Sequence, residues 1–108
     1  MNFHFDATAD ATATQVGTGR KRLRSIHAIE LDGAPAYVQF FDSASGGVTL
    51  GTTTPDLVVP IPPSGVVNLI WGDLGETFVT GLTYAVTTTA TGAVSPTTAV
   101  PITLGVGG

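Results

Sequence analysis

The sequence consists of short runs in which apolar and polar residues alternate, and Gly or Pro separates most runs from the next. A period of two places successive side chains on opposite faces of a β-strand, whereas a helix needs apolar residues three and four positions apart. The helical period is not found in windows of ordinary length. The clearest alternation is in the run 82–90, where Leu82, Tyr84 and Val86 point one way. The other side is predicted to form a flat surface of methyls and hydroxyls: Thr83, Ala85, Thr87 and Thr89.

The number and spacing of these runs indicate the fold class. They recur at intervals typical of all-β sandwiches and barrels, and 108 residues suffice for one domain with its own core. We predict an all-β chain folded as an antiparallel β-sandwich, jelly-roll-like, with about seven or eight strands. Residues 1–19 are predicted to form an N-terminal extended arm or edge strand, and residues 20–108 the sandwich domain.

The stretch 23–41 contains two runs rich in apolar residues on either side of Asp32-Gly33. Asp-Gly is a strong hairpin signal because Gly tolerates positive φ. We predict a hairpin in which His27 faces Phe40 and shares an apolar face with Leu23. The other face is mixed and offers a second contact surface: Arg24, Ile26, Ala28, Glu30, Tyr37, Gln39 and Phe41.

Two later runs differ in their expected position within the sheets. Pro60 has no N–H for a strand ladder, so the run 56–61 is predicted to lie at an edge or to leave the sheet there. The run 66–71 has apolar residues on both of its faces and a single polar residue, Asn68. This strand is therefore predicted to be covered on both sides over part of its length.

The charges are distributed unevenly. All four cations lie in the basic run 20–24, Arg-Lys-Arg-Leu-Arg, and all eight carboxylates lie outside it. Three interpretations are open: a solvated strand entrance whose cations prevent edge pairing, a contact with an acidic protein surface, and a contact with nucleic acid. The net charge of −4 and the absence of aromatic residues within the run argue against nucleic acid. We predict no nucleic-acid partner.

The first ten residues place Phe3 and Phe5 two positions apart in an extended stretch. Either an edge strand buries both rings in its own domain, or an arm docks them on a neighbouring subunit. The segment has neither a basic start nor a continuous apolar stretch, and no run is long enough to cross a bilayer. We predict a chain synthesised in the cytoplasm, with no membrane partner.

Residue types that carry catalysis or metal binding are scarce. The chain has no Cys, and His4 and His27 do not have the spacing of metal ligands. Neither a Gly-x-Ser-x-Gly elbow nor a phosphate-binding Gly-rich loop is found. Several acids fall in turns or at strand ends, where capping of loops is predicted: Asp32, Asp42, Asp56, Asp73 and Glu76. We predict no catalytic residue, no metal site, no cofactor and no enzymatic activity.

Three stretches together are similar to small virion proteins of tailed bacteriophages. The first is the segment 23–42, in which Tyr37-Val38 precedes a short apolar run. The second is the segment 51–65, which contains Gly-Thr-Thr-Thr-Pro and Val-Pro-Ile-Pro. The third is the segment 78–90, where Gly81-Leu82 precedes a Thr-rich strand. This resemblance covers most of the chain from about residue 23 onward. It implies a β-sandwich attached to the particle, and it supplies no catalytic residues.

The role implied by this resemblance is a capsid decoration or cement protein on the outer surface of the phage head. The implied partner is the major capsid protein, the implied location is the virion, and the implied oligomer is a trimer. Two alternatives remain: a neck or tail component of the virion, and a receptor- or carbohydrate-binding module using Trp71, Tyr37 and Tyr84. The candidate partner contacts are Phe3, Phe5, Arg20, Lys21, Arg22, Arg24, Ile26, Tyr37 and Phe41.

Overall fold

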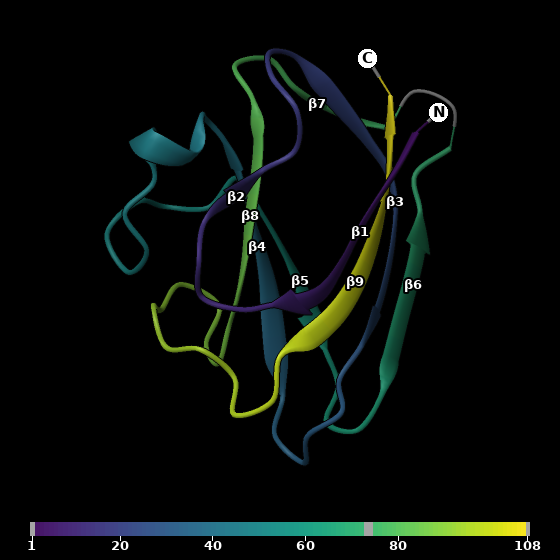
Figure 1. The fold of residues 1–108 in the computed structure, drawn as a ribbon, viewed down its shortest axis with the longest axis vertical. Coiled ribbons are helices and arrows are strands. Elements are labelled where there is room, and N and C mark those ends of the chain that lie inside the picture. Colours follow the sequence, from purple (N-terminus) through teal and green to yellow (C-terminus); the bar gives the residue numbers. More distant parts are fainter. Residues whose placement is uncertain (1, 73–74, 108) are drawn as a thin grey trace.

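The computed structural model describes residues 2–72 and 75–107 and consists of two antiparallel sheets packed face to face (Figure 1). The β3 sheet has the order β1 (Asn2–Ala9), β9 (Val100–Gly107), β3 (Lys21–Ile29) and β6 (Val66–Ile70), and β7 (Glu76–Phe78) also pairs with β3. The β4 sheet has the order β2 (Thr14–Gln15), β8 (Leu82–Thr87), β4 (Ala36–Asp42) and β5 (Leu57–Ile61). The predicted all-β sandwich is confirmed, with nine strands in the described residues rather than seven or eight.

The core lies between the two sheets and is built from the inward-facing residues that the alternation predicts. In β8, Leu82, Tyr84 and Val86 all face this core and are essentially inaccessible to solvent. The rings of Phe40 on β4 and Phe78 on β7 lie 6.3 Å apart, so the core joins the central strand of one sheet to the edge of the other. Apolar burial of this kind is the main stabilising contribution in a sandwich.

The predicted hairpin over 23–41 is wrong, because β3 and β4 belong to different sheets. The Asp32-Gly33 segment connects one sheet to the other. A hydrogen bond of 2.8 Å from the backbone N–H of Ser64 to the carbonyl of Asp32 holds this connection in place. A turn signal reports that the chain reverses, but not which strands pair. Here β3 pairs with β6, β7 and β9, whereas β4 pairs with β5 and β8.

The predicted apolar face of the first strand is also wrong beyond Leu23. The register between β3 and β9 shifts between Leu23 and Ser25, and an inserted residue reverses the alternation that follows it. Leu23 and Ile26 therefore both face the core, fully buried. His27, expected opposite Phe40, is exposed on the outside of the sheet.

Loops cover the outer face of the β4 sheet. Segments 43–56, which includes the short 3-10 helix η1 (Ser45–Gly47), and 88–99 lie on the side of this sheet away from the core (Figure 1). The hydroxyl of Thr83 donates to the carbonyl of Ser43 at 2.7 Å, and the side-chain amide of Gln39 donates to the carbonyl of Gly92 at 3.0 Å. The predicted flat surface of methyls and hydroxyls exists, but its members in β8 are buried: Thr83, Ala85 and Thr87.

Candidate interaction surface

The outer face of the β3 sheet is the opposite case, because bulky apolar side chains on it remain exposed. We call this surface the open face and define it by the outward residues of two rows across β1, β9, β3 and β6, together with Val66. One row consists of Phe3, Gly105, Ser25 and Ile70. The next row consists of Phe5, Thr103, His27 and Asn68.

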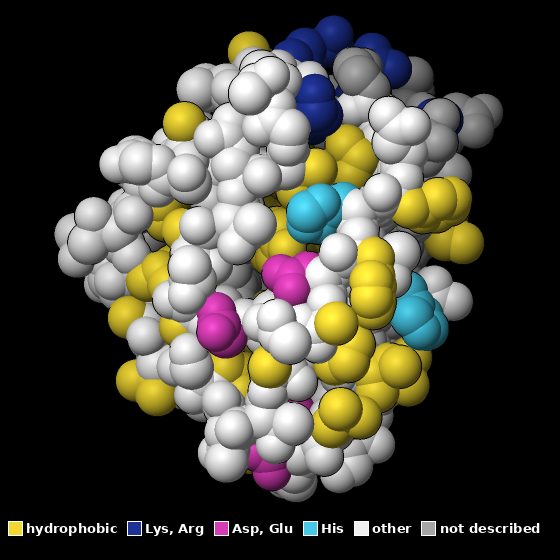
Figure 2. Space-filling view, viewed as in Figure 1, with side chains coloured by type: hydrophobic (Ala, Val, Ile, Leu, Met, Phe, Trp, Pro, Cys, Tyr) yellow, Lys and Arg dark blue, Asp and Glu magenta, His cyan; other side chains and the backbone are white. Residues whose placement is uncertain are grey.

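Bulky apolar residues lie on the two outer strands of the open face. Phe3 and Phe5 on β1 are 69% and 65% exposed, and Ile70 on β6 is 78% exposed. Figure 2 shows hydrophobic side chains gathered over β1 and β9, and Lys and Arg side chains gathered at the top of the same view. Single exposed apolar residues are ordinary, but several on one sheet face indicate a contact surface.

The basic run 20–24 divides between two sides of the β3 sheet. Arg22 and Arg24 lie on its outer side, next to Gly107. If Gly107 carried a Cβ atom, that atom would lie 3.8 Å from Cβ of Arg22 and 3.3 Å from Cδ of Arg24. Lys21 lies apart from them, and its Nζ donates to the carbonyl of Thr18 at 3.0 Å. Arg20 is exposed in the loop before β3. The open face therefore ends in two arginines rather than in the whole basic run.

The structure brings four of the nine predicted contact residues to the open face or its basic end: Phe3, Phe5, Arg22 and Arg24. Ile26 lies in the core, and Phe41 is 1% exposed on the covered side of the β4 sheet, so neither can reach a partner while the domain is folded. Tyr37 is half-buried in β4.

The residues that sequence analysis missed lie on β6. This strand was predicted to be covered on both sides over part of its length, but it is an edge strand with Val66 and Ile70 exposed on the open face. The predicted edge position of the Pro60 strand is confirmed, since β5 ends the β4 sheet. A proline indicates an edge strand by itself, because it lacks the N–H that a central strand needs. The apolar residues of β6 are instead typical of a central strand, so its sequence did not indicate an edge.

A polar network ties β1 to the opposite sheet. The hydroxyl of Tyr84 donates to Oδ2 of Asp6 at 2.7 Å and lies 2.9 Å from Nε2 of His4, which is placed to donate to it. The rings of His4 and Tyr84 meet edge to face, with centroids 5.6 Å apart. Burial, followed by the hydrogen bond to Asp6 and its charge, raises the pKa of Tyr84 well above its ordinary value. The phenol stays protonated at neutral pH, which suits a structural link rather than a nucleophile.

Replacement of Tyr84 by Phe tests this link. Tyr84→Phe is expected to lower the free energy of unfolding by about 1 to 2 kcal/mol, because Asp6 and His4 lose a shared partner. Since the pKa is raised in the folded state, the contribution of Tyr84 is complete below about pH 10 and is lost as the pH rises further. Urea unfolding measures the free energy of unfolding at pH 7 and pH 11. Between these two pH values the free energy of unfolding should fall less in Y84F than in the parent chain. An equal fall in both chains would contradict the raised pKa of Tyr84 in the folded state.

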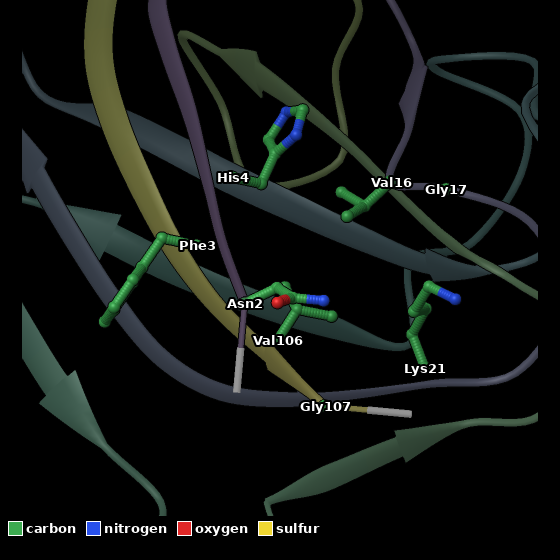
Figure 3. Close-up of a pocket in the computed structure, with 8 residues that line it drawn as sticks. All are labelled: Asn2, Phe3, His4, Val16, Gly17, Lys21, Val106 and Gly107. Atoms are coloured by element: carbon green, nitrogen blue, oxygen red, sulfur yellow. The ribbon is translucent and has the colours of Figure 1, made fainter.

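A pocket of about 240 Å³ opens beside this network (Figure 3). Its lining comes from β1, β3, β9 and the segment after β2, and includes His4, Lys21 and Gly17. Among the described residues, carboxylates do not line the pocket, Nε2 of His4 is occupied by the Tyr84 hydroxyl, and Nζ of Lys21 is bonded to a carbonyl. Both titratable side chains of the described lining, His4 and Lys21, are therefore hydrogen-bonded within the chain.

Capping of loops by acids is confirmed at three of the predicted positions. Oδ1 of Asp32 accepts from the N–H of Gly33 at 2.6 Å, and Oδ2 of Asp56 accepts from the N–H of Asp42 at 2.7 Å. Oδ1 of Asp42 accepts from the N–H of Thr80 at 2.7 Å. Burial raises the pKa of Asp42, but backbone donors around Thr80 outweigh it and leave this pKa below its ordinary value. Asp73 lies outside the described residues, and Glu76 lies in β7.

Metal-binding clusters and membrane-spanning helices are both absent from residues 2–72 and 75–107. This part of the chain contains no group of three or more His, Cys, Asp or Glu residues arranged to hold a metal ion. It also contains no helix of the length and apolar character that a membrane span requires. Comparison of the chain with family models, curated proteins and solved structures finds no match. The function is therefore inferred from the geometry of the two outer faces.

Proposed function

We propose that this chain is a non-enzymatic structural protein of a bacteriophage virion, a capsid decoration or cement protein bound to the outer surface of the head. The observation that carries the proposal is the asymmetry between the outer faces of the sandwich. Loops cover the β4 sheet and bury Phe41, whereas the β3 sheet leaves Phe3, Phe5 and Ile70 exposed. A face of this kind is matched by an apolar surface on a partner.

The resemblance to small virion proteins is the second support, and the strand pairing is the third. The pairs β1 with β9, β2 with β8, β3 with β6, and β4 with β5 are nested within one another along the chain. Folding one long antiparallel ribbon across two sheets produces this nesting, which supports a jelly-roll description of the sandwich. Jelly rolls are frequent in capsid domains, although a fold by itself does not define a function.

The electrostatics point to a partner surface with carboxylates beside an apolar patch. Arg22 and Arg24 end the open face, and guanidinium groups pair well with carboxylates. The proposed partner is the major capsid protein. The interface between one subunit and the capsid can be small, of about 1,000 Å² per subunit, because the capsid offers a lattice of identical sites. Contacts between neighbouring bound subunits then add avidity to each single binding event.

Co-sedimentation with particles tests this proposal. The purified chain is mixed with heads of its source virus from which the chain has been stripped or deleted, and the bound copies are counted. Saturable binding in hundreds of copies supports decoration, because every lattice position is then used. Saturation at about a dozen copies or fewer, as expected for fivefold or portal positions, would favour a neck, tail or vertex component instead. Absence of binding would overturn the role as a capsid decoration protein.

The carbohydrate-binding alternative has less support from the geometry. Its three candidate aromatic residues do not form an exposed platform, since Tyr84 is buried in the core and Trp71 packs against that core. Tyr37 lies on the other sheet from Trp71, half-buried in β4. Sugar rings need accessible aromatic surface for stacking. A glycan array would still detect such binding, and a specific glycan ligand would favour this alternative.

A further inference from the structure

Unpaired strand edges are sites of unwanted association, and three of the four edges in this sandwich carry a protective feature. In the β4 sheet, β2 has only two residues and β5 contains Pro60. In the β3 sheet, β1 has the charged Asp6 directed inward and an irregular register after it. Among the described residues, the fourth edge is formed by β6 and by β7, which also pairs with β3. The strand β7 begins with Glu76, whereas β6 reads Val-Val-Asn-Leu-Ile and itself carries no charge, proline or bulge.

The backbone of β6 presents a regular row of hydrogen-bonding groups to this edge. The N–H of Trp71 donates to the carbonyl of Arg24, and the N–H of Glu30 donates to the carbonyl of Gly65, so odd-numbered residues of this segment direct their polar groups toward β3. Opposed residues in an antiparallel pair alternate between bonded and non-bonded positions. Val66, Asn68 and Ile70 therefore direct their N–H and C=O groups away from β3. Among the described residues, no other strand pairs with that side, and β6 lies at the margin of the molecule (Figure 1).

We propose that the occupant of this edge is a second copy of the chain, paired antiparallel through β6 about a twofold axis at Asn68. In this register Asn68 faces its own copy, Val66 faces Ile70, and Val67 faces Leu69. Apolar residues meet apolar residues, and the amide of Asn68, which both donates and accepts, meets an identical amide. The three outward-bonding residues all fall at hydrogen-bonded positions of the new ladder.

The charges at the two ends of β6 fit the same arrangement. Arg24 lies beside the end of β6 at Trp71, with Glu76 of β7 next to it along β3, whereas Asp32 lies beside the opposite end, where its carbonyl binds Ser64. Antiparallel pairing places Arg24 of one copy near Asp32 of the other, twice by symmetry. Parallel pairing would instead put like charges together. This dimer does not depend on capsid binding and is a property of the chain alone.

Single cysteines give a direct test, because the natural chain has none. Asn68→Cys places two thiols at facing positions on the twofold axis, where Cα atoms of a bonded pair lie about 5.5 Å apart, within disulfide range. We expect mild oxidation to convert N68C into a covalent dimer at least about tenfold faster than Ile70→Cys. The matched control I70C lies on the same strand, at a residue that is 78% exposed, but its two copies would be separated by four positions of the ladder.

A mass measurement on the unmodified chain accompanies the crosslinking. Sedimentation at concentrations up to the millimolar range should show a particle of twice the 10.9 kDa mass of one chain. The variant Asn68→Lys should be a monomer, because a charge in the centre of the edge opposes strand pairing. The control variant Val94→Lys should remain a dimer. Equal crosslinking rates for N68C and I70C would overturn the proposed register. A monomer at every concentration, or the trimer implied by the resemblance, would overturn the twofold dimer. Capsid binding by such a monomer would leave the proposed function intact.

Discussion

Phe41→Ala is expected to lower the free energy of unfolding by about 3 to 5 kcal/mol, the usual range for removing a buried phenyl ring. Phe41 is 1% exposed, although it lies on the side of β4 that faces away from the core between the sheets. Its ring is covered by the chain's own loops, so its loss leaves a cavity beneath them. Guanidinium unfolding monitored by circular dichroism measures the change.

Phe3→Ala is the matched control for this experiment. Phe3 is 69% exposed on β1, so its truncation should change the free energy of unfolding by less than about 0.5 kcal/mol. The two phenylalanines thus differ in environment rather than in residue type. A stable F41A variant would mean that the loops do not seal the β4 sheet, and the asymmetry between the two outer faces would be lost.

The double variant Phe3→Ser/Phe5→Ser is expected to show the largest functional effect. Both rings project from the open face, and loss of two aromatic anchors should weaken binding of one subunit to stripped heads by about a hundredfold or more. Stability should stay close to that of the parent chain, because neither ring belongs to the core. Titration of stripped heads with labelled chain measures the affinity.

Val79→Ser/Val94→Ser provides the control for binding. Both valines are 66% exposed, close to the values for Phe3 and Phe5, but they lie in loops outside the β3 sheet. This variant removes apolar surface of similar accessibility from elsewhere and should bind like the parent chain. If both double variants bound equally well, the open face would not be the contact surface.

The alternation of side chains predicted the strands themselves with good accuracy. Leu82, Tyr84 and Val86 face the core as expected, because period two is a local property of the strand. Strand partners were harder to predict, since pairing depends on residues far apart in the chain. The segment around Asp32-Gly33 therefore looked like a hairpin turn but connects two sheets. The single inserted residue near Arg24 then reversed the predicted faces of β3.

Accessibility of the outer faces could not be predicted from strand pattern. The threonines of β8 form the expected polar surface, but the path of segments 43–56 and 88–99 determines that this surface is buried. In β6, the same apolar content that indicates a covered strand is found at an exposed edge. Phe3 and Phe5 were identified as contact candidates because aromatic residues near a terminus are unusual. Their exposure depends on which side of β1 faces Tyr84.

Carbene footprinting of the chain, free and bound to stripped heads, tests most directly whether the open face is the contact surface. Labelling reports side-chain accessibility without any substitution. We expect strong protection on binding for peptides that contain Phe3 and Phe5, and unchanged labelling around Val94, which is equally exposed in the free chain. Protection confined to segments 43–56 and 88–99, with Phe3 and Phe5 still labelled, would contradict this expectation and assign the contact to the loop-covered β4 sheet.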